Sequence, residues 1–172
     1  GPAAAARLQP SAVHGRRSVA RMSIATCRAT PADLDRLVPL FDGYRQFYGQ
    51  PSQPAVCRDF LRARLERGES AVFLALDDQH AVGFTQLYPG FSSVRARPIW
   101  WLNDLFVLAQ VRGRGAGRAL LDAASDHARA TGAACLMLET SADNTYAQGL
   151  YERYGYARLD PGSRFYQLVL AP

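Results

Sequence analysis

The stretch Val107-Leu-Ala-Gln-Val-Arg112-Gly113-Arg114-Gly115-Ala116-Gly117-Arg118 joins a strongly apolar run to a long helical pattern. The apolar run Ile99–Val107 predicts a strand, and the segment from about Arg114 to Thr131 predicts a helix that ends at Gly132. Glycines lack a Cβ and let backbone N–H groups approach a ligand closely. The following helix directs its unpaired N–H groups and the positive end of its dipole to the same place. The stretch therefore predicts an anion site, most naturally for phosphate or pyrophosphate.

Three phosphate-binding interpretations compete for this loop. A Walker A loop requires a lysine after its glycines, and the sequence contains no Lys, which excludes it. A dinucleotide fingerprint requires G-x-G-x-x-G early in a βαβ unit, whereas G-x-G-x-G occurs here late in the chain, and only Glu139 favours it. The third interpretation is the pyrophosphate of coenzyme A. A tight turn with solvated arginines is the plain structural alternative.

A second segment, Asp143–Tyr156, predicts a helix that Asn144 caps and Gly155 closes. Gly149 in the helix interior costs up to about 1 kcal/mol against alanine, which indicates close approach by another group. Tyr151 taken alone predicts a core aromatic with a satisfied hydroxyl.

The rest of the chain alternates between strand and helix patterns. A first strand, Ile24–Arg28, precedes a helix that Thr30 caps and Pro31 begins, and Pro39 is expected to kink or split that helix. The other predicted elements are a helix Ala55–Arg67, a hairpin of strands Ala71–Leu76 and Ala81–Tyr88, a polar loop Ser92–Pro98, a central strand Ala134–Thr140, a helix Asn144–Tyr154 and a last strand Phe165–Leu170. We expect a mixed α/β (α+β) fold of about seven strands and four helices, with a sheet antiparallel at first and parallel in the middle.

Most of the net charge of +5 comes from one end of the chain. All 20 basic residues are Arg; four lie in the first 21 residues, which hold no acid, so the rest carries 16 arginines and 15 acids. A nearly neutral domain disfavours nucleic-acid binding. No apolar run approaches the roughly 18 residues of a membrane span. We expect residues 1–21 to be a flexible extension, residues 22–172 one domain, and the location cytoplasmic, because no secretion signal is evident. The three cysteines lie far apart and predict no metal site.

Taken together, the two segments resemble the GNAT superfamily of acetyl-CoA-dependent N-acetyltransferases. Arg112-x-x-Gly115-x-Gly117 is similar to its pyrophosphate loop, and Asn144…Ala147…Leu150-Tyr151-Glu152-Arg153-Tyr154-Gly155-Tyr156 to its N…A…LYExxGF segment. The resemblance covers roughly residues 24–170. The Trp101–Val107 strand looks like the histone/polyamine acetyltransferase-like branch.

The resemblance implies a GNAT-like fold in which two central parallel strands, at Ile99–Val107 and Ala134–Thr140, splay to admit acetyl-CoA. Asn144 would hydrogen-bond to the amide portion of the cofactor, and Tyr151 would lie beside the thioester sulfur. The implied cofactor-binding residues are Leu105, Phe106 and Val107 for the pantetheine and acetyl carbonyl, and Arg112, Gly113, Arg114, Gly115, Ala116, Gly117 and Arg118 for the pyrophosphate.

The chemistry of these positions predicts Tyr151 as the general acid. A leaving thiol resembles cysteine, with a pKa of about 8.5, and the pKa of tyrosine is about 10, so donating the proton is uphill by roughly 2 kcal/mol. The nearby helix N-terminus should favour the phenolate slightly. Asp104 could draw the proton off the amine, directly or through a water, although alternation sends Asn103 and Asp104 to opposite faces unless a bulge intervenes. Relatives that acetylate polyamines carry an acid where this chain has Asn103.

We expect the acceptor site to form around the first helix and the hairpin. Its predicted substrate-binding residues are Tyr44, Tyr48, Gln86, Asn103 and Glu139. The expected function is direct acetyl transfer from acetyl-CoA to a primary amine of a small molecule, in a ternary complex. Acetylation of a protein N-terminus or lysine, and a non-catalytic acyl-CoA-binding sensor, remain as alternatives. The resemblance also allows a homodimer.

Overall fold

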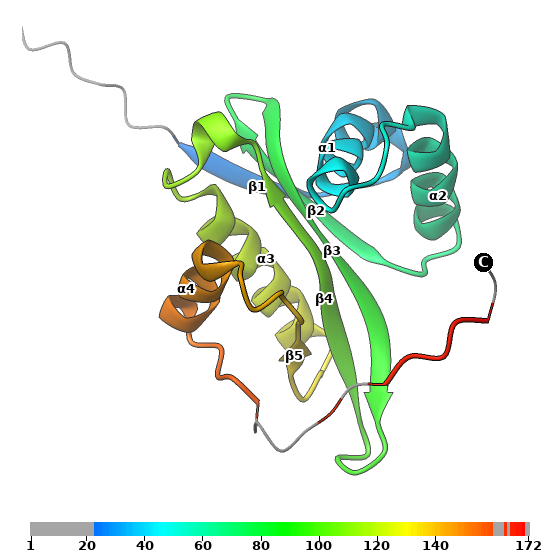
Figure 1. Ribbon diagram of the computed structural model, residues 1–172, viewed down its shortest axis with the longest axis vertical. Coiled ribbons are helices and arrows are strands. Elements are labelled where there is room, and N and C mark those ends of the chain that lie inside the picture. Colours follow the sequence, from blue (N-terminus) through cyan, green and yellow to red (C-terminus); the bar gives the residue numbers. More distant parts are fainter. Residues whose placement is uncertain (1–22, 160–163, 165, 171–172) are drawn as a thin grey trace, which may run out of the picture.

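The structure, a computed structural model, describes residues 23–159, 164 and 166–170 (Figure 1). The predicted extension, residues 1–21, lies outside the described residues. One mixed sheet runs through the described part of the molecule in the order β1-β2-β3-β4-β5. The first four strands pair antiparallel, and β4 and β5 pair in parallel, as predicted. The strands are β1 (Ile24–Arg28), β2 (Ala71–Asp77), β3 (His80–Ser92), β4 (Arg97–Val107) and β5 (Leu136–Met137).

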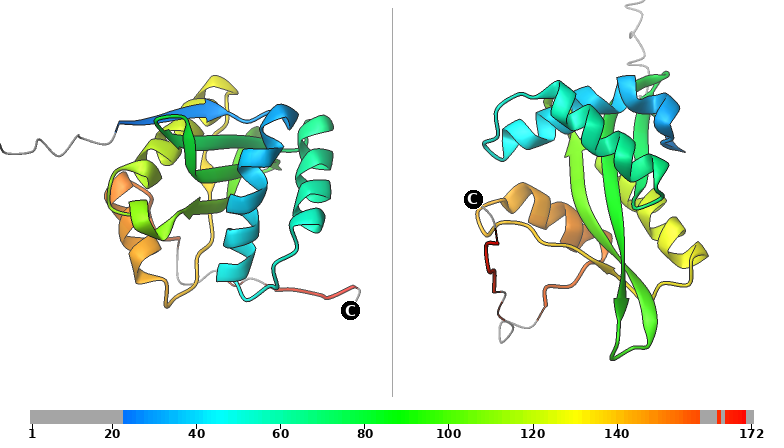
Figure 2. Two further views of the ribbon diagram at one scale, coloured as in Figure 1. Left: turned by 90° about the horizontal axis from the view of Figure 1, so that it is seen from above. Right: turned by 90° about the vertical axis from the view of Figure 1, so that its right-hand side faces the viewer.

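Helices cover both faces of the sheet (Figure 2). On one face, α1 and α2 pack on apolar side chains such as Leu37, Leu61 and Phe84, which are fully buried. On the other face, α3 and α4 pack around Leu87 and Leu121. The four α-helices of the described residues are α1 (Leu34–Phe47), α2 (Pro54–Glu66), α3 (Ala116–Ala130) and α4 (Thr145–Tyr154), within about two residues of their predicted bounds apart from the 3-10 turn Pro31–Asp33 that precedes α1.

The structure corrects two local predictions in part. Of the expected loop Ser92–Pro98, only residues 93–96 form a turn, and its ends belong to a two-stranded ribbon in which Ser92 pairs with Arg97. Polar side chains there face solvent while the backbone keeps its ladder of hydrogen bonds. Pro39 does not split α1, which is continuous. The carbonyl that Pro39 leaves without a donor belongs to Asp35, on the exposed side of the helix where water can reach it.

The parallel end of the sheet is shorter than predicted. Of the expected strand Ala134–Thr140, only Leu136 and Met137 are strand, opposite Trp100 and Trp101 of β4. Beyond these pairs β4 and the segment that follows β5 diverge, so the ladder of hydrogen bonds ends. The predicted last strand, Phe165–Leu170, forms no strand over residues 166–170, which are exposed and pair with no sheet edge; Phe165 lies outside the described residues. The described sheet therefore has five strands and not about seven.

None of the described helices combines the length and the apolar character that a membrane-crossing helix needs.

Candidate active site

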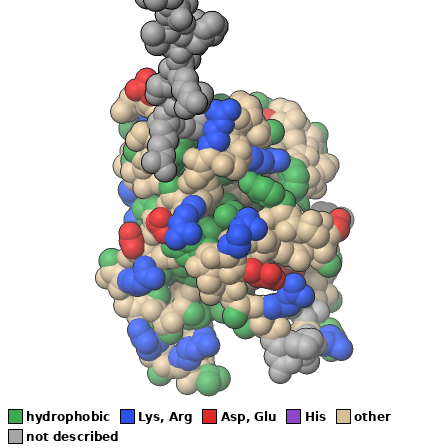
Figure 3. Space-filling view, turned by 90° about the vertical axis from the view of Figure 1, so that its left-hand side faces the viewer, with side chains coloured by type: hydrophobic (Ala, Val, Ile, Leu, Met, Phe, Trp, Pro, Cys, Tyr) green, Lys and Arg blue, Asp and Glu red, His purple; other side chains and the backbone are tan. Residues whose placement is uncertain are grey.

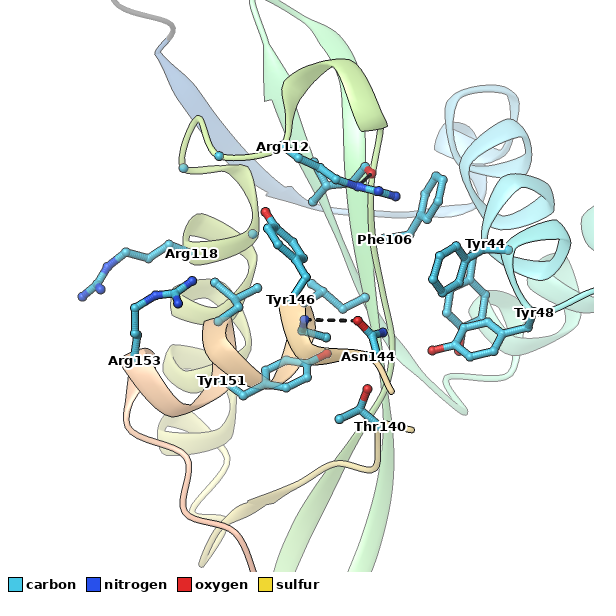
Figure 4. A pocket seen from close by; sticks show the side chains of 18 residues that line it. Tyr44, Tyr48, Phe106, Arg112, Arg118, Thr140, Asn144, Tyr146, Tyr151 and Arg153 are labelled. Atoms are coloured by element: carbon cyan, nitrogen blue, oxygen red, sulfur yellow. Dashed lines mark hydrogen bonds between the residues drawn. The ribbon is translucent and has the colours of Figure 1, made fainter. Parts of the chain in front are cut away.

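A cavity of about 560 Å³ lies where β4 and the chain after β5 diverge (Figure 4). Its size is in the range of sites that hold small molecules and cofactors. It gathers many of the predicted residues from three different parts of the chain. Among the predicted residues, it is lined by Tyr44, Tyr48, Leu105, Phe106, Val107, Arg112, Gly113, Gly115, Gly117, Arg118, Asn144 and Tyr151.

The glycine loop opens α3 without any side-chain cap. Gly113 and Gly115 take left-handed backbone conformations, with φ of 76° and 95°, which side chains disfavour. Gly115 is the N-cap residue, and the helix begins its bonding with the Ala119 N–H donating to the Gly115 carbonyl at 3.0 Å. The N–H groups of residues 116–118 precede that bond and have no carbonyl partner within the helix. This end of α3 can therefore hold an anion.

Arginines lie around this end of the cavity. Arg112 lines it and donates from Nε to the Val107 carbonyl at 3.1 Å, while Arg118 lines it from α3. Arg114, between them in sequence, does not line the cavity, and neither does Ala116, which is buried in the core. On the face drawn in Figure 3, acidic side chains lie among the arginines. The arginines are thus scattered and do not form a continuous basic surface on this face.

Arg153 is a lining residue that the sequence analysis missed. It reaches back along α4 over Gly149, where a Cβ would lie 2.8 Å from the arginine Nη1. The close approach that Gly149 indicated is therefore made by this guanidinium, which Figure 4 draws on the same side of the cavity as Arg118. Gly149 in the helix interior was the sequence signal, but it did not show that Arg153 is the group that approaches. Tyr146 and Thr140 are further lining residues that were not predicted.

Replacing Arg112 and Arg114 separately should distinguish a phosphate site from a solvated turn. We expect Arg112→Ala to weaken coenzyme A binding about tenfold, the effect of one lost charge-assisted contact, and Arg114→Ala to change it less than about twofold. Calorimetric titration at two salt concentrations measures both, and the salt dependence should fall only in the Arg112 variant. Equal effects of the two substitutions would contradict the site.

Asn144 caps α4 and also faces the cavity. Its Oδ1 accepts the Ala147 N–H at 3.2 Å, as a cap residue's side chain does. Because the oxygen is used in the cap, the side-chain amide nitrogen is the atom left to donate to a ligand. The neighbouring turn of α4 lies close against α3, since a Cβ at Gly117 would come within 3.1 Å of Leu150.

Tyr151 projects from α4 into the cavity and is 8% exposed (Figure 4). Burial raises the pKa of its hydroxyl to about 12. The expected help from the helix N-terminus is therefore outweighed, because desolvation disfavours the phenolate more strongly. Against a thiol with a pKa of about 8.5, the cost of giving up this proton grows to roughly 5 kcal/mol. The group is a firmly protonated phenol at neutral pH.

Asp104 lies beneath the cavity and does not line it. The pairing of Gln86 with Asp104 and of Leu87 with Leu102 leaves Asn103 as an extra residue, so β4 carries a bulge there. The Asp104 carboxylate is 2% exposed and accepts from the Gln86 side chain at 2.6 Å and from the Asn103 side chain at 2.9 Å. Burial raises the pKa of Asp104, while these hydrogen bonds oppose the rise. Gln86 is itself fully buried, is not among the residues that line the cavity, and holds the Asp104 carboxylate.

Aromatic rings from α1, and from Tyr48 just after it, form the opposite end of the cavity. The Tyr44 hydroxyl donates to the Asn103 carbonyl at 3.2 Å, and the Tyr48 ring lies 5.0 Å from that of Tyr44. Burial, with the negative charge of Asp104, raises the pKa of Tyr44 well above its usual value. Phe47 completes this wall, 5.2 Å from Tyr48. Tyr44 thus covers Asp104 from the cavity side.

Glu139 is placed elsewhere. It is exposed and lines a second cavity, of about 440 Å³, on the other side of Tyr151 and Thr140, which line both cavities. The structure therefore brings Tyr44 and Tyr48 into one site with Tyr151, and separates Glu139 from it. No cluster of three or more potential metal ligands occurs among the residues that the structure describes.

A splayed parallel strand pair, with an uncapped glycine-opened helix and arginines at one end of the gap, defines an acyltransferase that uses a coenzyme A thioester. The model of the Acetyltransferase (GNAT) family matches residues 36–156, and the chain belongs to that family. Acetyl-CoA is the acetyl donor of this family.

Several known proteins are similar to this chain. YhfO, an uncharacterized N-acetyltransferase of Bacillus subtilis, is 47% identical over 129 residues, which cover 75% of this chain and 87% of YhfO. The crystal structure of a probable acetyltransferase has a TM-score of 0.79 and 42% identity, covering 88% of this chain and 99% of that one. An aminoglycoside N-acetyltransferase in complex with CoA shares the fold, with a TM-score of 0.72, 21% identity, and coverage of 86% and 95%. The histone/polyamine-like branch stays a prediction.

Proposed function

We propose that the protein moves an acetyl group from acetyl-CoA to a primary amine of a small molecule, by direct transfer in a ternary complex. The observation that carries this proposal is that one cavity has two chemically different ends. Arginines and bare helix N–H groups line one end, aromatic rings over a buried carboxylate line the other, and Tyr151 lies between them (Figure 4). A donor and an acceptor can therefore meet at one phenol.

The residues at the first end fit the donor. The unpaired N–H groups of residues 116–118, with Arg112 and Arg118, would hold the pyrophosphate, and the β4 backbone at residues 105–107 would hold the pantetheine arm. Asn144 would donate its side-chain amide to the same arm. When bound, acetyl-CoA supplies an acetyl group activated as a thioester. Tyr151 holds a proton on Oη beside that position and can deliver it as a general acid.

The second end fits an amine with apolar surface. The rings of Tyr44, Phe47 and Tyr48 offer apolar and cation–π contacts, and the charge of Asp104 behind Tyr44 attracts a cation to them. Ordinary amines have a pKa near 10 and must lose a proton before they attack. Because Asp104 is 2% exposed, any proton that it takes must pass through Tyr44 or a water. The cavity volume suits a small acceptor.

A thiol-release screen with acetyl-CoA tests the proposal. The panel comprises amino acids, diamines, aminoglycosides and short peptides, with calorimetric titration of coenzyme A alongside. We expect release of the thiol with small amines that carry apolar or aromatic groups. Release with peptides alone would favour protein acetylation, and tight coenzyme A binding without release across the panel would favour a sensor domain. Either result would overturn the small-molecule proposal.

A further inference from the structure

We propose that Asp42 is a positioning residue for the acceptor: its buried carboxylate anchors the connection between α1 and α2, and thereby fixes the aromatic wall of the cavity. This inference rests on the proposed function and identifies a residue outside the cavity that controls it. Asp42 is on α1, 6% exposed, and lines neither cavity. A buried carboxylate must be hydrogen-bonded to persist, so its partners show what it holds in place.

Four donors meet this carboxylate, and most come from beyond the end of α1. Oδ1 accepts the Gln53 backbone N–H at 2.8 Å and the Cys57 thiol at 3.4 Å. Oδ2 accepts the Ser52 hydroxyl at 2.7 Å and the Gln46 side-chain amide at 3.0 Å. The Ser52 hydroxyl and the Gln53 N–H hold the pKa of Asp42 below its usual value, so it is a carboxylate at neutral pH. The charge therefore strengthens each of these bonds.

The connection, residues 48–53, is held at its other end by the C-terminus of α1. The N–H groups of Gly49 and Gln50 donate to the carbonyls of Gln46 and Arg45, both at 3.0 Å. The Arg45 guanidinium also donates to the Gln53 side-chain oxygen at 3.4 Å. Asp42 thus closes a loop whose first residue is Tyr48, against the start of α2.

The aromatic wall of the cavity depends on this anchored connection because two of its side chains are largely exposed. Phe47 and Tyr48 are 58% and 52% exposed, so little core packing fixes them. Their positions depend on one another, through ring contacts of 5.0 Å between Tyr44 and Tyr48 and 5.2 Å between Phe47 and Tyr48, and on the backbone that carries them. A carboxylate that immobilises this backbone preorganises the acceptor wall and leaves the arginine end of the cavity untouched.

The test compares Asp42→Asn with Asp35→Asn. Asp35 is also on α1 and also bonds to α2, through a 2.6 Å ion pair with Arg58, but its side chain is 88% exposed and far from the loop's anchor. We expect Asp42→Asn to raise the KM for the best amine of the screen about tenfold, with kcat and the coenzyme A Kd within about twofold of wild type. Asp35→Asn should leave all three unchanged. Ser52→Ala removes one donor from an exposed residue, cannot unfold the core, and should raise KM about threefold.

Hydrogen exchange gives an independent readout. Amides of residues 48–53 should exchange faster in Asp42→Asn and at the wild-type rate in Asp35→Asn, with the amides of α3 unchanged in both. An unaltered KM in both Asp42→Asn and Ser52→Ala, in an enzyme that binds coenzyme A and releases thiol, would overturn the inference and leave the proposed function standing. If no variant binds coenzyme A or releases thiol, the proposed function fails, and unaltered exchange over residues 48–53 would then overturn the anchoring as well.

Discussion

A Tyr151→Phe enzyme should lose about 100-fold in kcat while its Kd for coenzyme A stays within about twofold. The substitution removes a proton donor and almost nothing else. The ring packs with Leu121 and Leu102 in the core on the α3 face, and phenylalanine keeps that packing. No hydrogen bond of the Tyr151 hydroxyl occurs within the described part of the chain, so its removal leaves no described partner unsatisfied. Single-turnover acetyl transfer and calorimetric titration measure the two quantities.

Tyr156→Phe is the matched control. Its buried hydroxyl has no hydrogen-bond partner among the described residues, and its ring lies 5.8 Å from that of Tyr151, but it does not line the 560 Å³ cavity. We expect its kcat to match wild type, and a full rate in Tyr151→Phe would remove the acid role.

The pH dependence checks the same assignment. Because burial raises the Tyr151 pKa to about 12, the acid stays protonated at pH 10, so kcat should show no alkaline fall from its titration up to that pH. A fall with an apparent pKa near 10 that disappears in Tyr151→Phe would show that the phenol is not desolvated as described.

Local chemistry made the cofactor side of the site predictable from the sequence. The left-handed backbone conformation at positions 113 and 115 by itself favours glycine. The lack of a side-chain cap on α3 and the Asn144 cap on α4 are each properties of a single helix end. Such features depend on a few neighbouring residues, so a sequence pattern contains them in full. Six of the cofactor-side residues that line the cavity belong to these two patterns, whereas Leu105, Phe106 and Val107 were implied only by the family resemblance.

The acceptor side depends on contacts between segments that are distant in the sequence, and no local sequence pattern predicts such contacts. The bulge at Asn103 arises from the register between β3 and β4, and it turns Asp104 inward, against Gln86 and under Tyr44. Glu139 was expected near the end of the predicted strand Ala134–Thr140, but the strand ends at Met137. The raised pKa of Tyr151 follows from the burial of its side chain, and that burial depends on several strands and helices together. Each of these is a tertiary property.

The largest expected effect on donor binding comes from Gly115→Val. At φ of 95° a β-branched residue is strained by about 1–3 kcal/mol. Apart from the adjoining residues, no atom of the described residues lies within 4 Å of a Cβ at this position, so the turn has room to relax by changing its backbone. That relaxation moves the N–H groups at the start of α3 away from the pyrophosphate. Strain together with lost charge-assisted bonds should weaken coenzyme A binding about 100-fold or more. Calorimetric titration measures the affinity, and thermal unfolding measures the stability.

Gly132→Val, at the other end of α3, separates the effect of backbone strain from the loss of bonds to the pyrophosphate. Gly132 follows the C-terminal end of α3 and has a φ of 74°. In the part of the chain that the structure describes, only the adjoining residues come within 4 Å of its Cβ position, so the strain resembles that at Gly115. Both variants should therefore unfold at lower temperature by similar amounts, whereas only Gly115→Val should lose coenzyme A. If Gly115→Val is destabilised as Gly132→Val is but keeps its affinity, the pyrophosphate is held elsewhere. The arginines around the turn would then be solvated charges, and the donor end of the cavity would have to be reassigned.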